Sequence, residues 1–223
     1  MMSVASSTFL LVYAALFPIV NPLGSAPVFL SLTRHYPAKV RYGLAARISV
    51  NGFLLLVGSV LVGSHILDFF GIALPIVRVA GGCVVSAMAW QLLREGAAEA
   101  EGKTIAVAAD RLNDPLQQAF YPLTMPLTVG PGSIATAITL GSQRPVAVPT
   151  VENLAVLGVA ATAAMLAIAA TIYLSYRFAD TIEVILGRSA TNVLVRLSAF
   201  ILLCIGFQII WSGVDGLIGA AKP

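Results

Sequence analysis

The chain has 223 residues, of which 58% are hydrophobic and 10% are charged, and its mean hydropathy is +0.92. These values lie far outside the range of soluble globular domains and indicate a protein that crosses a membrane several times. The net charge of +3 does not indicate nucleic-acid binding, because the basic residues are scattered over loops rather than gathered in one patch.

Six stretches are long and apolar enough to cross a lipid bilayer as helices, which requires about 20 mostly apolar residues each. They are residues 4–33, 43–62, 72–93, 119–140, 154–176 and 191–218. Alternating strand patterns are missing, so the sequence predicts an all-α bundle of six transmembrane helices. Residues 1–8 lack the features of a secretory signal, and we therefore expect the first span to stay in the mature protein.

Proline and glycine interrupt the first and the fourth of these spans. The first break contains Asn21, Pro22, Gly24 and Ser25, and the second contains Thr128, Gly130, Pro131, Gly132 and Ser133. A proline inside a helix removes a backbone hydrogen bond, and the freed groups are tolerated at membrane depth only where they face protein or water. Breaks at corresponding positions of two chain halves are typical of the midplane substrate site of a secondary transporter.

The order of these features repeats along the chain. Each half has a broken span, a plain span and a third span that opens on an arginine, Arg78 or Arg196, and carries a glutamine further on, Gln91 or Gln208. A polar linker over residues 95–114 separates the first repeat, 1–94, from the second, 115–223. Three spans per repeat place the second half in the membrane with inverted topology, an arrangement common in secondary carriers.

The distribution of basic residues predicts the orientation. The odd-numbered loops carry almost all of the Lys and Arg, whereas the even-numbered loops and the tails carry only Arg144 and Lys222. The positive-inside rule therefore places the odd loops and the linker in the cytoplasm and both termini outside it. Trp90, Trp211, Tyr173 and Tyr176 lie near span ends, where aromatic belts mark the depth of the bilayer surface.

The two breaks supply the groups that we expect to bind a solute. Amides at the start of a helix fragment favour an anion such as a carboxylate, and the glycines let a ligand approach the backbone. Asn21, Ser25, Thr128 and Ser133 add side-chain hydrogen bonds. No Asp or Glu lies near the middle of a span, which favours a small neutral or zwitterionic solute over a cation.

Other polar residues within the spans have two interpretations each. Asn51, Gln91 and Gln208 either line the solute pathway or bond between helices. Arg78 and Arg196 are expected to extend to the membrane surface, with a gating ion pair as the alternative. The coupling ion is not readable: a proton or another cation could drive transport, and passive facilitation is the other option.

Enzymatic motifs are missing from the sequence. It has no Walker loop, dinucleotide fingerprint, zinc-ligand cluster or nucleophile elbow, and Ser25 and Ser133 have no nearby His, Lys or acid partner. We therefore expect a protein that is not an enzyme and that needs no cofactor or metal.

Asn21-Pro22-Leu23-Gly24-Ser25-Ala26-Pro27-Val28-Phe29 and residues 126–134, the segment of the second break, resemble the MarC family of bacterial and archaeal inner-membrane proteins. The length, the six spans, the acidic linker and the Ala-Gly-Gly start of the third span agree with it. The resemblance implies a multi-pass plasma-membrane protein of the class of small neutral amino acid transporters.

The sequence thus predicts a secondary transporter or exporter of glycine- or alanine-like amino acids, embedded in the inner membrane. The alternatives are a membrane scaffold or regulatory protein that does not transport, and a facilitator for another small solute. Neither the direction of transport nor the oligomeric state follows from the sequence.

Overall fold

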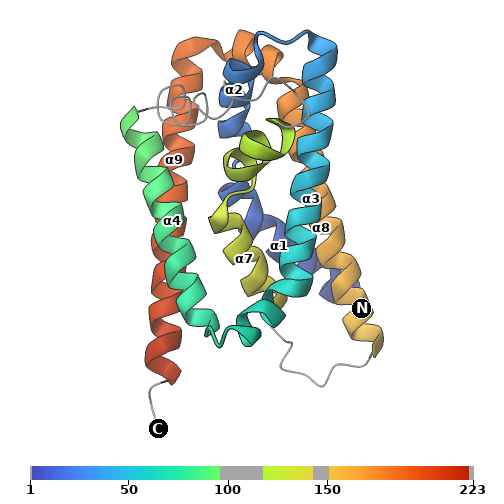
Figure 1. Ribbon diagram of the computed structural model, residues 1–223, viewed down its shortest axis with the longest axis vertical. Coiled ribbons are helices and arrows are strands. Elements are labelled where there is room, and N and C mark those ends of the chain that lie inside the picture. The colour runs from blue at the N-terminus through green and yellow to red at the C-terminus, as the bar shows by residue number, and fades with distance from the viewer. Residues whose placement is uncertain (1, 96–117, 143–150, 221–223) are drawn as a thin grey trace.

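The computed structural model describes residues 2–95, 118–142 and 151–220, and every regular element within them is helical (Figure 1). The elements in chain order are α1 (Met2–Val20), α2 (Pro22–Thr33), α3 (Ala38–Phe69), α4 (Leu74–Glu95), η1 (Ala119–Thr128), α7 (Pro131–Ser142), α8 (Val151–Arg177) and α9 (Ala179–Ala220). Five helical units are long and apolar enough to cross a membrane, and the bent pair of η1 and α7 passes the same test as a sixth. The predicted helical membrane fold is confirmed, and each predicted span falls on one of these units.

Both predicted breaks are present, but they differ in form. α1 and α2 meet at Asn21, whose φ of 47° and ψ of 55° place it in the left-handed region. η1 and α7 are bent by 71° relative to each other, and η1 is irregular, with extended backbone at Tyr121 and Met125. Backbone amides in this region donate hydrogen bonds to the carbonyl five residues earlier, as the Val129 amide does to the Thr124 carbonyl at 2.8 Å.

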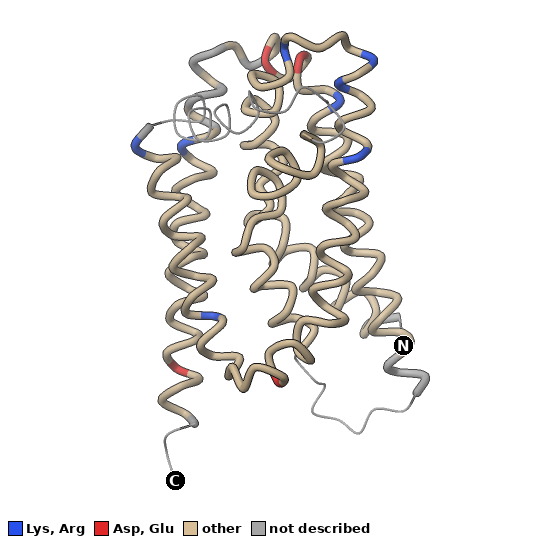
Figure 2. The backbone as a smooth tube through the Cα atoms, viewed as in Figure 1, with Lys and Arg blue, Asp and Glu red and all other residues tan. Residues whose placement is uncertain are grey.

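The helices run along the long axis of the molecule in alternating directions (Figure 1). α1 with α2 runs upward, α3 returns, α4 runs upward, η1 with α7 returns, α8 runs upward and α9 returns. The two halves therefore run in opposite order, as in any alternating bundle divided three and three, and the inverted repeat stays a prediction. α1 begins and α9 ends at the lower end, whereas most of the Lys and Arg shown gather at the upper end (Figure 2). The predicted linker, 95–114, lies almost entirely outside the described residues.

The helices form two packed groups. α1, α2, α3, η1, α7 and α8 surround most of the main apolar core, in which Leu16, Phe29, Ile48 and Ile168 are fully buried. Leu92 of α4 and Val195 of α9 also reach this core. α4 and α9 stand side by side at the left of Figure 1 and pack mainly against each other. A small second cluster of Val85, Ala89 and Leu202 connects this pair to Ile19 of α1. We call α4 and α9 the helix pair.

Glycines let the backbones of the helix pair approach closely, as small residues do in membrane helices. A Cβ on Gly206 would lie 2.3 Å from the Ser86 Oγ and 2.9 Å from the Ser86 backbone nitrogen. A Cβ on Gly213 would lie 2.8 Å from the Pro75 carbonyl oxygen. Because these neighbours are largely backbone, they cannot turn aside.

We expect Gly206→Ala to lower the stability of the protein in detergent by about 1–3 kcal/mol, the usual cost of overpacking a helix contact. Thermal unfolding of the purified protein measures this loss. The control is Gly58→Ala in α3, where a Cβ meets nothing within 4 Å and where helix propensity favours alanine. Equal melting temperatures for the two variants would contradict the close α4–α9 contact.

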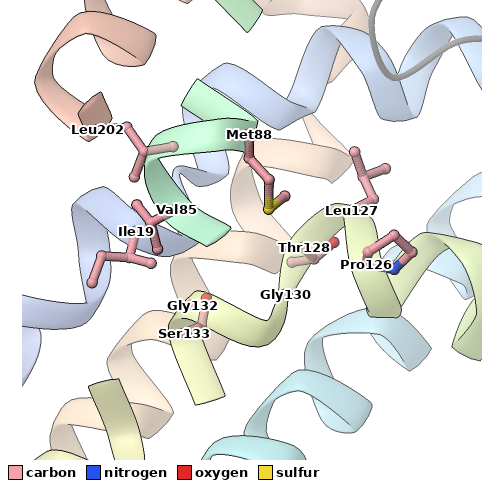
Figure 3. Close-up of a pocket in the computed structure, with 10 residues that line it drawn as sticks. All are labelled: Ile19, Val85, Met88, Pro126, Leu127, Thr128, Gly130, Gly132, Ser133 and Leu202. Carbon is pink, nitrogen blue, oxygen red and sulfur yellow. The ribbon is translucent and has the colours of Figure 1, made fainter. Parts of the chain in front are cut away.

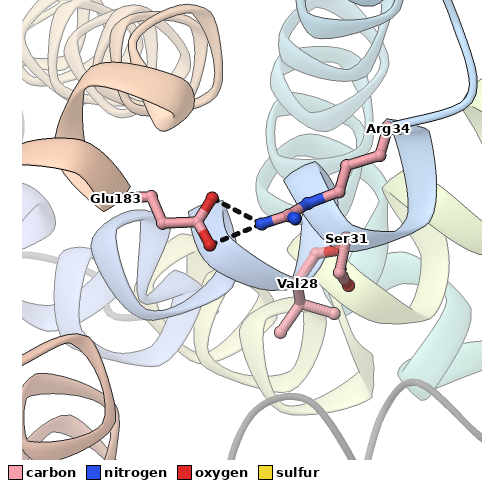
Figure 4. Close-up of polar contacts among 4 residues, drawn as sticks. All are labelled: Val28, Ser31, Arg34 and Glu183. Carbon is pink, nitrogen blue, oxygen red and sulfur yellow. Dashed lines mark hydrogen bonds and ion pairs between the residues drawn. The ribbon is translucent and has the colours of Figure 1, made fainter. Parts of the chain in front are cut away.

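The upper end of the molecule is closed by ion pairs between segments far apart in sequence. Arg34, which follows α2, donates to both carboxylate oxygens of Glu183 in the first part of α9 (Figure 4). Arg41 of α3 pairs with Asp180 in the same part of α9. α9 is not straight: Gly187 has a φ of 68°, so a short helical segment precedes the long one. The sequence prediction of a span over 191–218 missed this segment.

Candidate functional site

A small cavity lies where the helix pair meets the second break (Figure 3). Its lining comes from Ile19 of α1, Val85 and Met88 of α4, Leu202 of α9 and six residues of the segment 126–133. The volume open to the centre of a water molecule is about 30 Å³, enough for one or two waters. Four of the predicted site residues line it, namely Thr128, Gly130, Gly132 and Ser133. Pro131 is exposed and does not.

The start of α7 supplies hydrogen-bond donors to this cavity. The first amides of a helix have no carbonyl one turn earlier to accept from them, and in α7 the Ile134 amide is the one that reaches back to the Gly130 carbonyl, at 3.2 Å. The amides of Gly132 and Ser133 precede it and lie beside the cavity. The Ser133 side chain is 2% exposed and lines the cavity, where its hydroxyl adds a further polar group.

The first break uses its own polar groups differently. The Asn21 side chain accepts a hydrogen bond from the Gly24 amide at 3.2 Å, and the Asn21 carbonyl accepts from the Ser25 amide at 3.0 Å. Pro22 has no amide hydrogen to offer. Asn21 therefore caps the start of α2, a role in which asparagine is common. Asn21, Pro22, Gly24 and Ser25 do not line the cavity.

Tyr176 of α8 connects the two breaks. Its hydroxyl donates to the Ser25 Oγ at 3.1 Å and contacts the Thr128 Oγ1 at 2.7 Å. Tyr176 is 3% exposed, and its ring stacks on Phe29 with centroids 4.4 Å apart. The sequence analysis assigned this tyrosine to an aromatic belt, which is wrong because the side chain is buried in the core. Trp90 and Trp211 are exposed at 57% and 68%, as belt residues should be.

The hydroxyls of Ser25, Tyr176 and Thr128 form a chain with fewer hydroxyl hydrogens than oxygen–oxygen contacts. The Ser25 hydroxyl donates to the Asn21 carbonyl at 2.9 Å, and the Thr128 hydroxyl donates to the Leu123 carbonyl at 2.7 Å. With the two contacts of Tyr176, four oxygen–oxygen contacts share three hydroxyl hydrogens. One contact therefore lacks a hydrogen at any moment, so the chain has alternative donor arrangements that keep the same atoms together.

The other polar residues predicted within spans lie outside the cavity lining. Asn51 is partly buried, with its Nδ2 3.5 Å from the Thr124 Oγ1 of η1. The Arg78 Nε is buried without a partner among the described residues. Arg196, Gln91 and Gln208 are exposed on the outer surfaces of α4 and α9. Asn51 is thus the one of these five that contacts η1, the helix before the second break.

No charged side chain among the described residues lines the cavity. No residue that lines it is ionisable, and no group of three His, Cys, Asp or Glu within residues 2–95, 118–142 and 151–220 could hold a metal ion. Its polar character comes from the dipoles of the interrupted backbone and from hydroxyls. Such a site suits a solute whose own charges sum to zero.

Comparison with known proteins places this architecture in a family. Residues 6–218 match the model of the MarC family integral membrane proteins. A UPF0056 membrane protein of Pyrococcus horikoshii is 31% identical over 216 residues, covering 96% of this chain and 98% of its own length. The UPF0056 membrane protein YvbG of Bacillus subtilis is 30% identical, covering 92% and 93%.

A UPF0056 inner membrane protein MarC of Escherichia coli is also 30% identical over 207 residues, covering 91% of this chain and 92% of its own length. No solved structure matches the fold. With a family match over nearly the whole sequence, this chain belongs to the MarC family of integral membrane proteins.

Proposed function

We propose that the chain is a secondary transporter of small neutral amino acids that binds its substrate at the second break. One observation carries the proposal: a cavity with no ionisable side chain lies where the helix pair meets the second break, and the start of α7 and the buried Ser133 border it. Ligand sites of carriers with broken helices occur at such places.

The second break complements a zwitterion at both of its charged ends. The amides at the start of α7 carry partial positive charge and favour the carboxylate, with the Ser133 hydroxyl as a further donor. The end of η1 carries partial negative charge from its last carbonyls and favours the ammonium group. The Pro126 carbonyl oxygen lies 3.2 Å from the position of a Cβ on Gly130, so this end of η1 faces the same glycine segment. The lining elsewhere is apolar, which limits the solute to a small side chain.

The size of the cavity supports a mechanism in which the site opens and closes. A volume of about 30 Å³ is too small for an amino acid, and we therefore interpret this conformation as a closed one. Entry of the substrate requires the helix pair to move away from the second break. The positive-inside rule assigns the upper end, where Arg34 and Arg41 lie, to the cytoplasm, and we therefore place the chain in the inner membrane with both termini outside the cytoplasm.

Uptake of labelled glycine and alanine into proteoliposomes that contain the purified protein tests this function. We expect accumulation above that of protein-free liposomes, and stimulation by an imposed proton gradient would identify the coupling ion. Flux that only equilibrates the two sides would instead identify a facilitator. Correctly inserted protein that moves neither amino acid would contradict the proposal and favour a scaffold or regulatory role.

A further inference from the structure

The wall opposite the start of α7 is formed by α4, and Val85 is its closest point. A Cβ built on Gly132 would lie 2.1 Å from the Val85 Cγ2, so no atom beyond a glycine hydrogen fits between the two helices here. Met88, one turn further along α4, lies opposite Gly130, where a Cβ would be 3.6 Å from its Cε. Figure 3 shows both side chains beside the glycine segment of the break.

The two side chains differ in how much they can yield. Valine is branched at Cβ and has one strongly preferred rotamer in a helix, so Val85 is a stiff obstacle. Methionine has three rotatable bonds and adapts to its neighbours, so Met88 can move aside. Val85 is also 2% exposed and lies in the small cluster with Ala89 and Leu202, which restricts it further.

In this closed conformation the position of α4 depends on contacts other than those of Val85. One turn before it, a Cβ on Gly81 would lie 2.5 Å from the Ala135 Cβ of α7, which sets the separation of the two helices. On its other side α4 is in close contact with α9 at Gly82 and Gly206. Removing the methyl groups of Val85 therefore enlarges the space next to the start of α7 rather than allowing α4 to collapse onto it.

We propose that Val85 determines the specificity of this site for glycine and alanine over larger neutral amino acids, with Met88 as the adaptable part of the same wall. This inference rests on the proposed function. A substrate held with its carboxylate at the amides of Gly132 and Ser133 places its side chain toward α4, because Val85 and Met88 lie opposite the glycine segment of the break. The γ-methyl groups of Val85 then meet the first carbon atoms of any side chain longer than a methyl group.

The test compares the uptake of labelled valine with that of labelled glycine by the wild type, Val85→Ala and Val84→Ala. Val84 is the matched control, because it is the adjacent residue on α4 and is 37% exposed. We expect Val85→Ala to raise the valine-to-glycine ratio at least about tenfold, since one methylene in an apolar pocket changes specificity by about 10–200-fold. Val84→Ala should leave the ratio of the wild type unchanged.

The outcomes separate this inference from the proposed function. A wild type that takes up glycine, combined with an unchanged ratio in Val85→Ala, overturns the role of Val85 alone. An equal rise in both variants also overturns it, because it indicates general loosening of α4. A wild type that takes up neither glycine nor alanine overturns both proposals. If Val85→Ala is not recovered folded, Val85→Cys replaces it and should shift the ratio in the same direction.

Discussion

Replacing Gly132 with alanine should lower glycine uptake at least about tenfold while the protein still inserts into the membrane. The added Cβ would lie 2.1 Å from the Val85 Cγ2, far inside van der Waals contact, and overpacking of this kind costs about 1–3 kcal/mol, where 1.4 kcal/mol is tenfold in an equilibrium constant. The clash forces α7 and α4 apart at the amides that we assign to the carboxylate. Uptake of labelled glycine in proteoliposomes measures the effect.

The matched control for this change is Gly58→Ala, which adds a Cβ in open space on α3. A second variant, Gly132→Ala combined with Val85→Ala, removes the obstacle and should recover part of the lost uptake. Full uptake by Gly132→Ala alone would show that the start of α7 is not the site. Loss in the single variant without any recovery in the double variant would contradict the assigned contact with Val85.

The second large effect is expected for Tyr176→Phe. The substitution keeps the ring that stacks on Phe29 and removes the hydroxyl that contacts both Ser25 and Thr128. Loss of one partner from buried polar groups costs about 1–3 kcal/mol, so the melting temperature in detergent should fall and the uptake of glycine should decrease with it.

Tyr173→Phe is the matched control for Tyr176→Phe, because it removes a hydroxyl from the same helix. That hydroxyl accepts a hydrogen bond from Arg177 at 2.9 Å and is only partly buried. We expect Tyr173→Phe to behave nearly as the wild type does. If both variants lose the same stability, the link between the two breaks through Tyr176 has no special importance.

The sequence predicted the membrane spans well because hydropathy and length reflect a requirement of each helix separately. Each apolar stretch must bury its own backbone in lipid, and this needs no knowledge of its neighbours. From the sequence alone, the segment before Gly187 is expected to be a loop between two spans, because it is short and carries Asp180 and Glu183. Only the left-handed backbone of Gly187, which composition does not reveal, separates it from the span that follows.

The site was predicted less completely because its contacts depend on the arrangement of the helices. Proline and glycine located both breaks, and Ser133 and Gly132 do line the cavity. An asparagine at a break uses the same groups to bind a ligand or to cap its own helix, and the sequence could not distinguish these uses for Asn21. Tyr176 and Val85 carry no local pattern of their own, since a buried tyrosine near a span end and a valine in an apolar helix look ordinary.

The contact between the helix pair and the other helices has a consequence for the balance of conformations. Its large buried side chains are Val85 and Leu202 of the small cluster and Leu92 and Val195, which join the main core, and exposing these four to water would cost about 6–12 kcal/mol at 1.5–3 kcal/mol each. A ligand that favours the separated form must offset a bias of this size by binding that form better. The core around α3 and α8 buries more side chains completely, so separation at the helix pair is the less costly opening of this fold.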